Sequence, residues 1–132
     1  MIVLDTHIWV WWVHNDSQLS EQQRMLIQEN EAQVLGINVI SCWEIAKLVE
    51  YDRLTLPCSV SDWFEKALAY PGIQLLNLTP RIAIESTQLP GIFHRDPADQ
   101  IIVATARVYD CELLTADEKI QKYPYVKLPK GV

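Results

Sequence analysis

Short runs of apolar residues alternate along this chain with longer segments in which apolar positions recur every three or four residues. The short runs, such as IVLD near the start and IQLLNL in the middle, are typical of buried strands. The longer segments are typical of amphipathic helices that bury one face. The predicted strands are 2–5, 33–37, 73–78, 112–115 and 125–128.

Capping and breaking residues bound the predicted helices. Ser20 with Gln23, and Ser41 with Glu44, have the spacing of a capping box, in which two side chains satisfy free N–H groups at a helix start. Pro80 is at the first position of a predicted helix, where the missing N–H of proline costs nothing because that group has no partner within the helix. The predicted helices are 20–30, 41–54, 59–70, 80–88 and 97–109.

Strands that alternate with helices predict an α/β fold with a central, mainly parallel sheet flanked by helices. The chain has 132 residues, the length of one domain, and contains no repeat, low-complexity segment or internal linker. We therefore expect a single α/β domain over 1–132. In open parallel sheets, binding sites form at the carboxyl ends of the strands.

Acidic residues from distant parts of the sequence fall at that edge of the predicted sheet. Asp5 closes the first strand, and Asp117 follows the fourth predicted strand by two residues. Glu44 lies in the first turn of the helix after the second strand. Asp99, with Asp96 three residues before it, lies at the start of the last predicted helix. Helix N-termini face the same edge when the helix leads into the next parallel strand, so we expect these carboxylates to converge.

Converging carboxylates repel one another. Two ionised groups about 5 Å apart, at an effective dielectric constant of about 20, repel by about 3 kcal/mol. A helix N-terminus offsets typically less than about 1 kcal/mol of this. A fold that keeps such a cluster needs a bound cation, and oxygen ligands without cysteine or histidine suit Mg²⁺ or Mn²⁺. Such a site can grip phosphates and activate a water molecule.

Four motifs occur in the order IVLDT, SCWEIAKL, DPADQIIVATA and LLTADEKI. Together, and over essentially the whole chain, they resemble the PIN-domain nucleases, and among these the VapC-type toxins of bacterial toxin–antitoxin pairs. The resemblance implies a ribonuclease in which Asp5, Glu44, Asp99 and Asp117 surround one or two Mg²⁺ or Mn²⁺ ions. It also implies an antitoxin that covers the acidic groove, and a homodimer. Related toxins often carry arginine directly after the third acid, where this chain has Gln100.

Each acid also has a structural alternative. Glu44 and Asp99 are placed to complete capping boxes, and Asp117 can sit in a turn. Asp96 is a good N-cap, so this role is favoured over metal contact. Asp5 has the weakest structural explanation, because a charge at the end of a buried strand is costly without a partner.

Hydroxyl and basic side chains accompany these acids. The hydroxyls beside them are expected to donate hydrogen bonds to the metal ligands, although such residues are also ordinary helix caps; they are Thr6, Ser41 and Thr115. The basic side chains either contact phosphate or are solvated surface charges; they are His94, Arg95 and Lys47.

The composition, 49% hydrophobic and 21% charged, is that of a soluble globular domain. No stretch approaches the roughly 20 apolar residues of a membrane helix, and the N-terminus lacks the basic segment of a signal peptide. Three cysteines without CxxC spacing are typical of reduced thiols, so we expect a cytoplasmic protein without a membrane partner. The tryptophans with helical spacing favour core packing, with some aromatic surface left for a dimer interface; they are Trp9, Trp12, Trp43 and Trp63.

The net charge of −6 argues at first against a nucleic-acid partner, because phosphate binding usually requires a basic surface. Setting aside the five candidate metal-binding acids, however, leaves 12 acids against 11 bases. Bound divalent cations would add further positive charge at the site. The overall charge therefore does not exclude RNA as a substrate.

Two other functions stay open from the residues alone. A phosphatase or phosphoryl-transfer domain also places acids at strand ends, but it needs a nucleophilic aspartate and a lysine near the phosphate. The sequence has no DxD pair after the first strand and no clear lysine after a late strand. A binding module without catalysis would share the fold and show no turnover with any metal.

Overall fold

Four parallel strands form the central sheet of the computed structural model, which describes residues 1–132. They are β1 (Ile2–Leu4), β2 (Leu35–Asn38), β3 (Ile73–Leu76) and β4 (Glu112–Leu114). Their order across the sheet is β3-β2-β1-β4, with Ile2 of β1 opposite Leu35 on one side and Glu112 on the other. The predicted α/β fold with a parallel sheet is confirmed.

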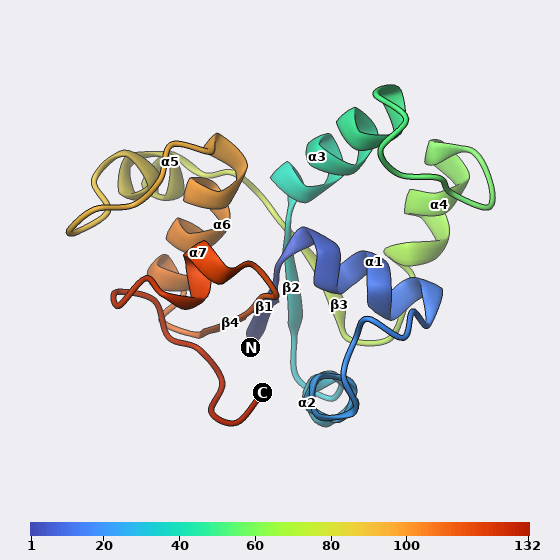
Figure 1. Cartoon of the computed structure of the whole chain (residues 1–132), viewed down its shortest axis with the longest axis horizontal. Helices are drawn as coiled ribbons and strands as arrows, with labels where there is room; N and C mark the ends of the chain where they lie inside the picture. The colour runs from blue at the N-terminus through green and yellow to red at the C-terminus, as the bar shows by residue number, and fades with distance from the viewer.

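Seven helices connect and cover the strands (Figure 1). In Figure 1, α1, α3 and α4 lie to one side of the sheet and α5, α6 and α7 to the other. Helices α1 and α3 begin directly after β1 and β2, so their N-termini lie at the carboxyl edge of the sheet. The helices are α1 (Thr6–His14), α2 (Glu21–Asn30), α3 (Val39–Glu50), α4 (Val60–Ala67), α5 (Pro80–Thr87), α6 (Pro97–Val108) and α7 (Glu118–Gln121).

Strand β1 directs its side chains into two hydrophobic cores. Ile2 and Leu4 pack in the core that includes Trp9 of α1, while Val3 packs in the core that includes Ile102 of α6. Both faces of a parallel sheet are covered by crossover helices, so its strands are apolar throughout rather than alternating. This explains why the IVL run before Asp5 is continuous.

Most of the tryptophans pack in the first core, as the sequence predicts. Trp9 and Trp63 are buried with their ring centroids 5.1 Å apart, and Trp12 packs against the same core. Trp43 differs, because it lies on α3 with 53% of its surface exposed.

Helix α3 begins two residues earlier than the capping pattern predicts. Asn38, the last residue of β2, is its N-cap, and its side-chain oxygen accepts the Ile40 N–H at 2.9 Å. The Asn38 amide nitrogen donates to Thr105 Oγ1 of α6 at 2.9 Å, and Asn38 is fully buried. The capping-box prediction for Ser41 and Glu44 is therefore wrong, because an asparagine at the strand end already caps the helix.

Replacing Asn38 with alanine is expected to lower the free energy of unfolding by about 2–4 kcal/mol. The change removes an N-cap worth about 1 kcal/mol and leaves the buried Thr105 hydroxyl without its donor. Urea unfolding measures the loss. Ser20→Ala, which removes the cap of α2 nearer the surface, should cost only about 1 kcal/mol. Equal losses in the two variants would contradict a bridging role for Asn38.

The predicted last strand at 125–128 is wrong. One backbone hydrogen bond joins this segment to β4, from Leu113 N–H to the Lys127 carbonyl at 2.9 Å. Pro124 and Pro129 flank the segment, and proline has no N–H to extend a ladder. The Tyr125 carbonyl instead accepts a hydrogen bond from the Arg107 guanidinium of α6.

None of the helices combines the length and hydrophobicity that a membrane crossing requires. All three cysteines are free thiols of intermediate burial. Burial raises the pKa of the Cys42 and Cys111 thiols, which makes them poorer nucleophiles.

Candidate functional site

Asp5 is fixed at the carboxyl end of β1 by three neighbouring groups. Its Oδ1 accepts the Thr6 N–H at 2.8 Å as the N-cap of α1, and its Oδ2 accepts the Thr115 hydroxyl at 2.7 Å. The Asp5 N–H donates to the Leu114 carbonyl of β4. Burial raises the pKa of this carboxyl, and the Asp117 charge adds to the effect. Asp5 is thus a buried acid with a fixed orientation.

Three further carboxylates meet between α3 and α6. Glu44, Asp96 and Asp99 each place one oxygen so that all three lie within 4.8 Å of one another. Glu44 comes from the second turn of α3, and its Oε1 is buried without a hydrogen-bond partner. A buried carboxylate oxygen normally has a donor, so this free oxygen calls for a cation or a water molecule. Three of the five acids expected to converge therefore lie close together, whereas Asp5 and Asp117 lie outside this group.

Burial and mutual repulsion raise the pKa values of two of these acids. Burial raises the pKa of Glu44 to about 7, with Asp5, Asp99 and Asp96 adding to the shift. Burial likewise raises the pKa of Asp99 to about 6, against the opposing hydrogen bond from His94. Each acid is harder to ionise mainly because it is buried and further because its neighbours are acids, and a bound cation would offset both effects.

Asp96 is the N-cap that the sequence favours, and it also lies close to two other acids. Its Oδ1 accepts the Asp99 N–H at 3.0 Å, which makes it the N-cap of α6, and it also belongs to the close carboxylate group. Asp99 does not complete a capping box, because its carboxylate contacts His94 rather than the Asp96 N–H. The capping explanation thus holds for Asp96 and fails for Asp99.

His94 is a site residue whose contact the sequence does not reveal. Its Nε2 lies 2.6 Å from Asp99 Oδ2, and Gln100 Nε2 donates to the His94 carbonyl at 3.1 Å. His94 precedes Asp99 by five residues across a loop, and this spacing matches neither a helix nor a strand repeat. Only the folded structure therefore shows that the two side chains meet. Gln100, which stands where related toxins often have arginine, fixes the loop that carries His94.

Asp117 lies at the border of the site. Its Oδ1 accepts the Lys119 and Ile120 N–H groups as the N-cap of α7, and its own N–H donates to Thr115 Oγ1. It is not part of the group within 4.8 Å, but its charge raises the pKa of both Asp5 and Asp99. A structural role at the start of α7 therefore explains the hydrogen bonds of Asp117, while its charge makes Asp5 and Asp99 harder to ionise.

The three candidate hydroxyls have different partners. Thr115 donates to Asp5, and Thr6 Oγ1 and Ser41 Oγ lie 2.8 Å apart and bond to each other. This buried pair joins α1 to α3 behind the acids. Hydrogen bonding by Thr6 also lowers the pKa of Glu44, against the larger effect of burial. Of the basic candidates, Lys47 pairs with Glu50 at 3.1 Å.

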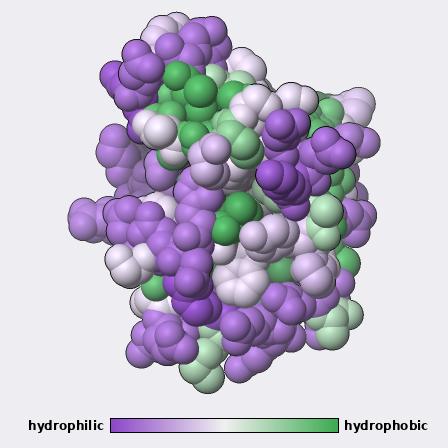
Figure 2. Space-filling view, turned by 90° about the vertical axis from the view of Figure 1, so that its right-hand side faces the viewer, coloured by the Kyte–Doolittle hydropathy of each residue, from purple (hydrophilic) through white to green (hydrophobic).

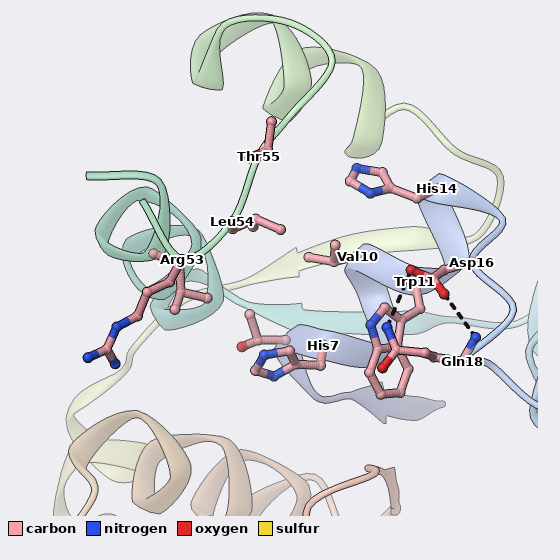
Figure 3. A pocket seen from close by; sticks show the side chains of 11 residues that line it. His7, Val10, Trp11, His14, Asp16, Gln18, Arg53, Leu54 and Thr55 are labelled. Carbon is pink, nitrogen blue, oxygen red and sulfur yellow. Dashed lines mark hydrogen bonds between the residues drawn. The ribbon is translucent and has the colours of Figure 1, made fainter. Parts of the chain in front are cut away.

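A polar pocket of about 340 Å³ begins beside Asp5, at Thr6 and His7 (Figure 3). In Figure 3, Arg53 from the loop after α3 lies across the pocket from Trp11 and His14 of α1. Asp16 lies at its far end, where both carboxylate oxygens accept hydrogen bonds from Gln18.

The residues at the sheet edge fit a hard divalent cation. All the converging ligand atoms are carboxylate oxygens, which Mg²⁺ and Mn²⁺ prefer. The free Glu44 Oε1 and the raised pKa values both indicate that the cluster is incomplete without positive charge.

Comparison with known proteins gives matches over nearly the full chain. The sequence profile described as "PIN domain" matches residues 2–125. Ribonuclease VapC22 from Mycobacterium tuberculosis is 30% identical over 122 residues, which cover 92% of this chain and 91% of that protein.

The fold is also similar to solved structures of other proteins. VapBC2 from Rickettsia felis, bound to a DNA fragment from its promoter, gives a TM-score of 0.69 at 15% identity, covering 98% of each chain. A toxin–antitoxin complex from Klebsiella pneumoniae gives a TM-score of 0.64 at 21% identity, covering 100% of each chain. FitAcB from Neisseria gonorrhoeae gives 0.62 at 19% identity, covering 90% of this chain and 89% of that one.

Proposed function

The chain belongs to the PIN-domain family, and on that premise we propose that it is a metal-dependent endoribonuclease acting as the toxin of a type II toxin–antitoxin pair. The observation that carries this proposal is the group of Glu44, Asp96 and Asp99 within 4.8 Å, with one buried oxygen of Glu44 unpartnered. The likeness to a protein named as a ribonuclease supports RNA as the substrate.

Each acid has a distinct part in this proposal. Glu44 and Asp99 hold Mg²⁺ or Mn²⁺ from opposite helices, with Asp96 as a third ligand. Asp5, oriented by Thr115, adds a fixed charge directly or through water, and Asp117 does so from the border of the site. When bound, the cation acts as a Lewis acid and lowers the pKa of a water ligand. His94 holds Asp99 Oδ2, so the ligand oxygen of that carboxylate is oriented in advance.

RNA cleavage by this protein is expected to require Mg²⁺ or Mn²⁺. Excess EDTA should lower the cleavage rate by at least about a hundredfold, because a water molecule without a metal has a pKa far above neutral. Gel analysis of a labelled single-stranded RNA measures the rate, and added Mn²⁺ should restore it. Glu44→Gln protein purified in the same way controls for contaminating nucleases. Unchanged cleavage in EDTA would contradict the metal mechanism.

We further propose an antitoxin as the protein partner, covering the acidic edge of the sheet. One structural neighbour is described as a toxin–antitoxin complex, which supports a partner of this kind. On the face in Figure 2, hydrophobic side chains form separate patches within a mainly hydrophilic surface. A homodimer stays a prediction from the family resemblance.

Expression of the chain alone is expected to stop bacterial growth. Asp5→Asn should restore growth, because it removes the charge of the buried acid while keeping its shape and its N-cap hydrogen bond. Plating after strong induction measures the effect, with equal protein levels checked by immunoblot. Co-expression of the protein encoded by the neighbouring gene should also restore growth. Equal growth of wild-type and Asp5→Asn cells would contradict the toxin role.

A further inference from the structure

A second pocket, of about 280 Å³, lies beside the carboxylates between the loop before α6 and the end of α7. It is separate from the pocket of Figure 3, with which it shares no lining residue. We call it the α7 pocket. It is lined by Ile92, Phe93, His94, Lys119, Lys122, Tyr123 and Pro124.

The α7 pocket is directly connected to the candidate metal ligands. His94 lines the pocket and contacts Asp99 Oδ2 at 2.6 Å. Lys119 also lines it, and the Lys119 N–H donates to the Asp117 carboxylate at 2.8 Å. A molecule in the pocket would therefore lie beside the side chain that contacts Asp99 and beside the helix whose N-cap is Asp117.

The charge of the α7 pocket is opposite to that of the acidic cluster. Lys119 and Lys122 form no ion pair, whereas Lys47 and Lys127 are paired with acids. No aspartate or glutamate lines the α7 pocket, while the pocket of Figure 3 contains Asp16. In a chain of net charge −6, two unpaired lysines beside a group of acids are suited to an anion that must approach that group.

The remaining walls of the α7 pocket are apolar and aromatic. The Phe93 ring lies 4.3 Å from the His94 ring and 4.8 Å from the Tyr123 ring, measured between centroids. Ile92, next to Phe93, is 95% exposed. Unpaired lysines beside partly exposed apolar and aromatic groups are the combination with which proteins bind single-stranded nucleic acid.

We propose that the α7 pocket binds the nucleotide next to the cleaved phosphodiester, with Lys119 and Lys122 at its phosphate and Ile92 and Phe93 against its base. This inference rests on the proposed ribonuclease function. It makes these residues part of substrate binding, so their loss should weaken RNA affinity and leave the metal ligands intact.

The test compares Lys119→Gln/Lys122→Gln with wild type and with Lys66→Gln/Lys130→Gln. The control pair removes the same charge from lysines that do not line the α7 pocket. Cleavage of a labelled single-stranded RNA gives KM and kcat. Fluorescence anisotropy of the same RNA, in a Glu44→Gln background that does not cleave it, gives affinity at several salt concentrations.

The pocket variant is expected to raise KM about tenfold or more and to change kcat by less than about threefold. The slope of log affinity against log salt should fall by about 0.7, the value for one phosphate of a single strand that is no longer neutralised. Lys119→Arg/Lys122→Arg should restore most of the affinity, and the control pair should stay within about twofold of wild type. Equal effects in the two glutamine pairs, or an effect only on binding of a protein partner, would overturn this inference. If wild-type protein cleaves no RNA with Mg²⁺ or Mn²⁺, the proposed function fails instead.

Discussion

Glu44→Gln and Asp99→Asn are each expected to reduce RNA cleavage by at least about a thousandfold while making the metal-free protein more stable. The two carboxylates lie in one group with Asp96, and the charge of Asp99 adds to the rise in the pKa of Glu44 that burial causes. Removing one charge relieves repulsion, so at pH 8 the free energy of unfolding should rise by about 1–3 kcal/mol. The same change removes a ligand, so stabilisation by added Mn²⁺ should fall.

Helix α4 offers a matched control for these variants. Asp62 is the third residue of α4 after its N-cap Ser59, which is the position that Asp99 has in α6 after Asp96. Asp62 is exposed and lies outside the acidic group, so Asp62→Asn tests the loss of a helix-end charge alone. It should change stability by less than about 1 kcal/mol and leave cleavage unaffected.

Thermal melts with and without Mn²⁺, together with the RNA cleavage assay, distinguish a metal-binding role of Glu44 and Asp99 from a purely structural role. A variant that melts like wild type, keeps the full Mn²⁺ shift and still cleaves RNA would have only a structural role. That outcome for Glu44→Gln would also leave the unpartnered Glu44 Oε1 without a functional explanation.

The sequence predicts the edge of the sheet at which the acids meet, because that position follows from topology. Strand ends and helix starts determine where Asp5, Asp99 and Asp117 lie once the sheet is parallel. The sequence also predicts Glu44 near the site, although α3 begins two residues earlier than the capping pattern indicates. Two residues of helix correspond to a rise of only about 3 Å, so Glu44 still lies close to the N-terminal end of α3.

The sequence does not reveal contacts that depend on tertiary structure. Asn38 is an ordinary strand-end residue until Thr105, 67 positions later, is packed against it. His94 is brought to Asp99 by a loop with no regular spacing. The segment at 125–128 has an apolar pattern typical of a strand, but a pattern of side chains does not show which backbone groups find partners.

The family match also decides between the functions that the residues alone left open. A phosphatase or a binding module is compatible with acids at strand ends, but neither accounts for a full-length match to the PIN domain and to a protein named as a ribonuclease. The acidic site should therefore be tested for RNA cleavage.

Metal binding is expected to strengthen steeply as the pH rises from 5 to 7. Burial raises the pKa of Glu44 to about 7 and that of Asp99 to about 6, so both carboxyls are largely protonated at pH 5. A cation must displace these protons, and each proton released makes the affinity rise about tenfold per pH unit below the pKa of its carboxyl. Mn²⁺ affinity should therefore rise at least about a hundredfold over this range and level off above pH 7.

The metal-free protein should show the opposite dependence. Between the unfolded and folded pKa values of these acids, the folded state binds more protons, so the free energy of unfolding falls as the pH rises. Repulsion is fully developed above about pH 8, where both groups are ionised, and is absent below about pH 3, where both are protonated in the folded and in the unfolded state. Melting curves from pH 4.5 to 8, with EDTA and with Mn²⁺, should diverge as the pH rises. In Glu44→Gln the group that titrates near 7 is lost, so the divergence should be smaller and complete by about pH 6. Parallel curves across this range in the wild-type protein would contradict a metal site formed by Glu44 and Asp99.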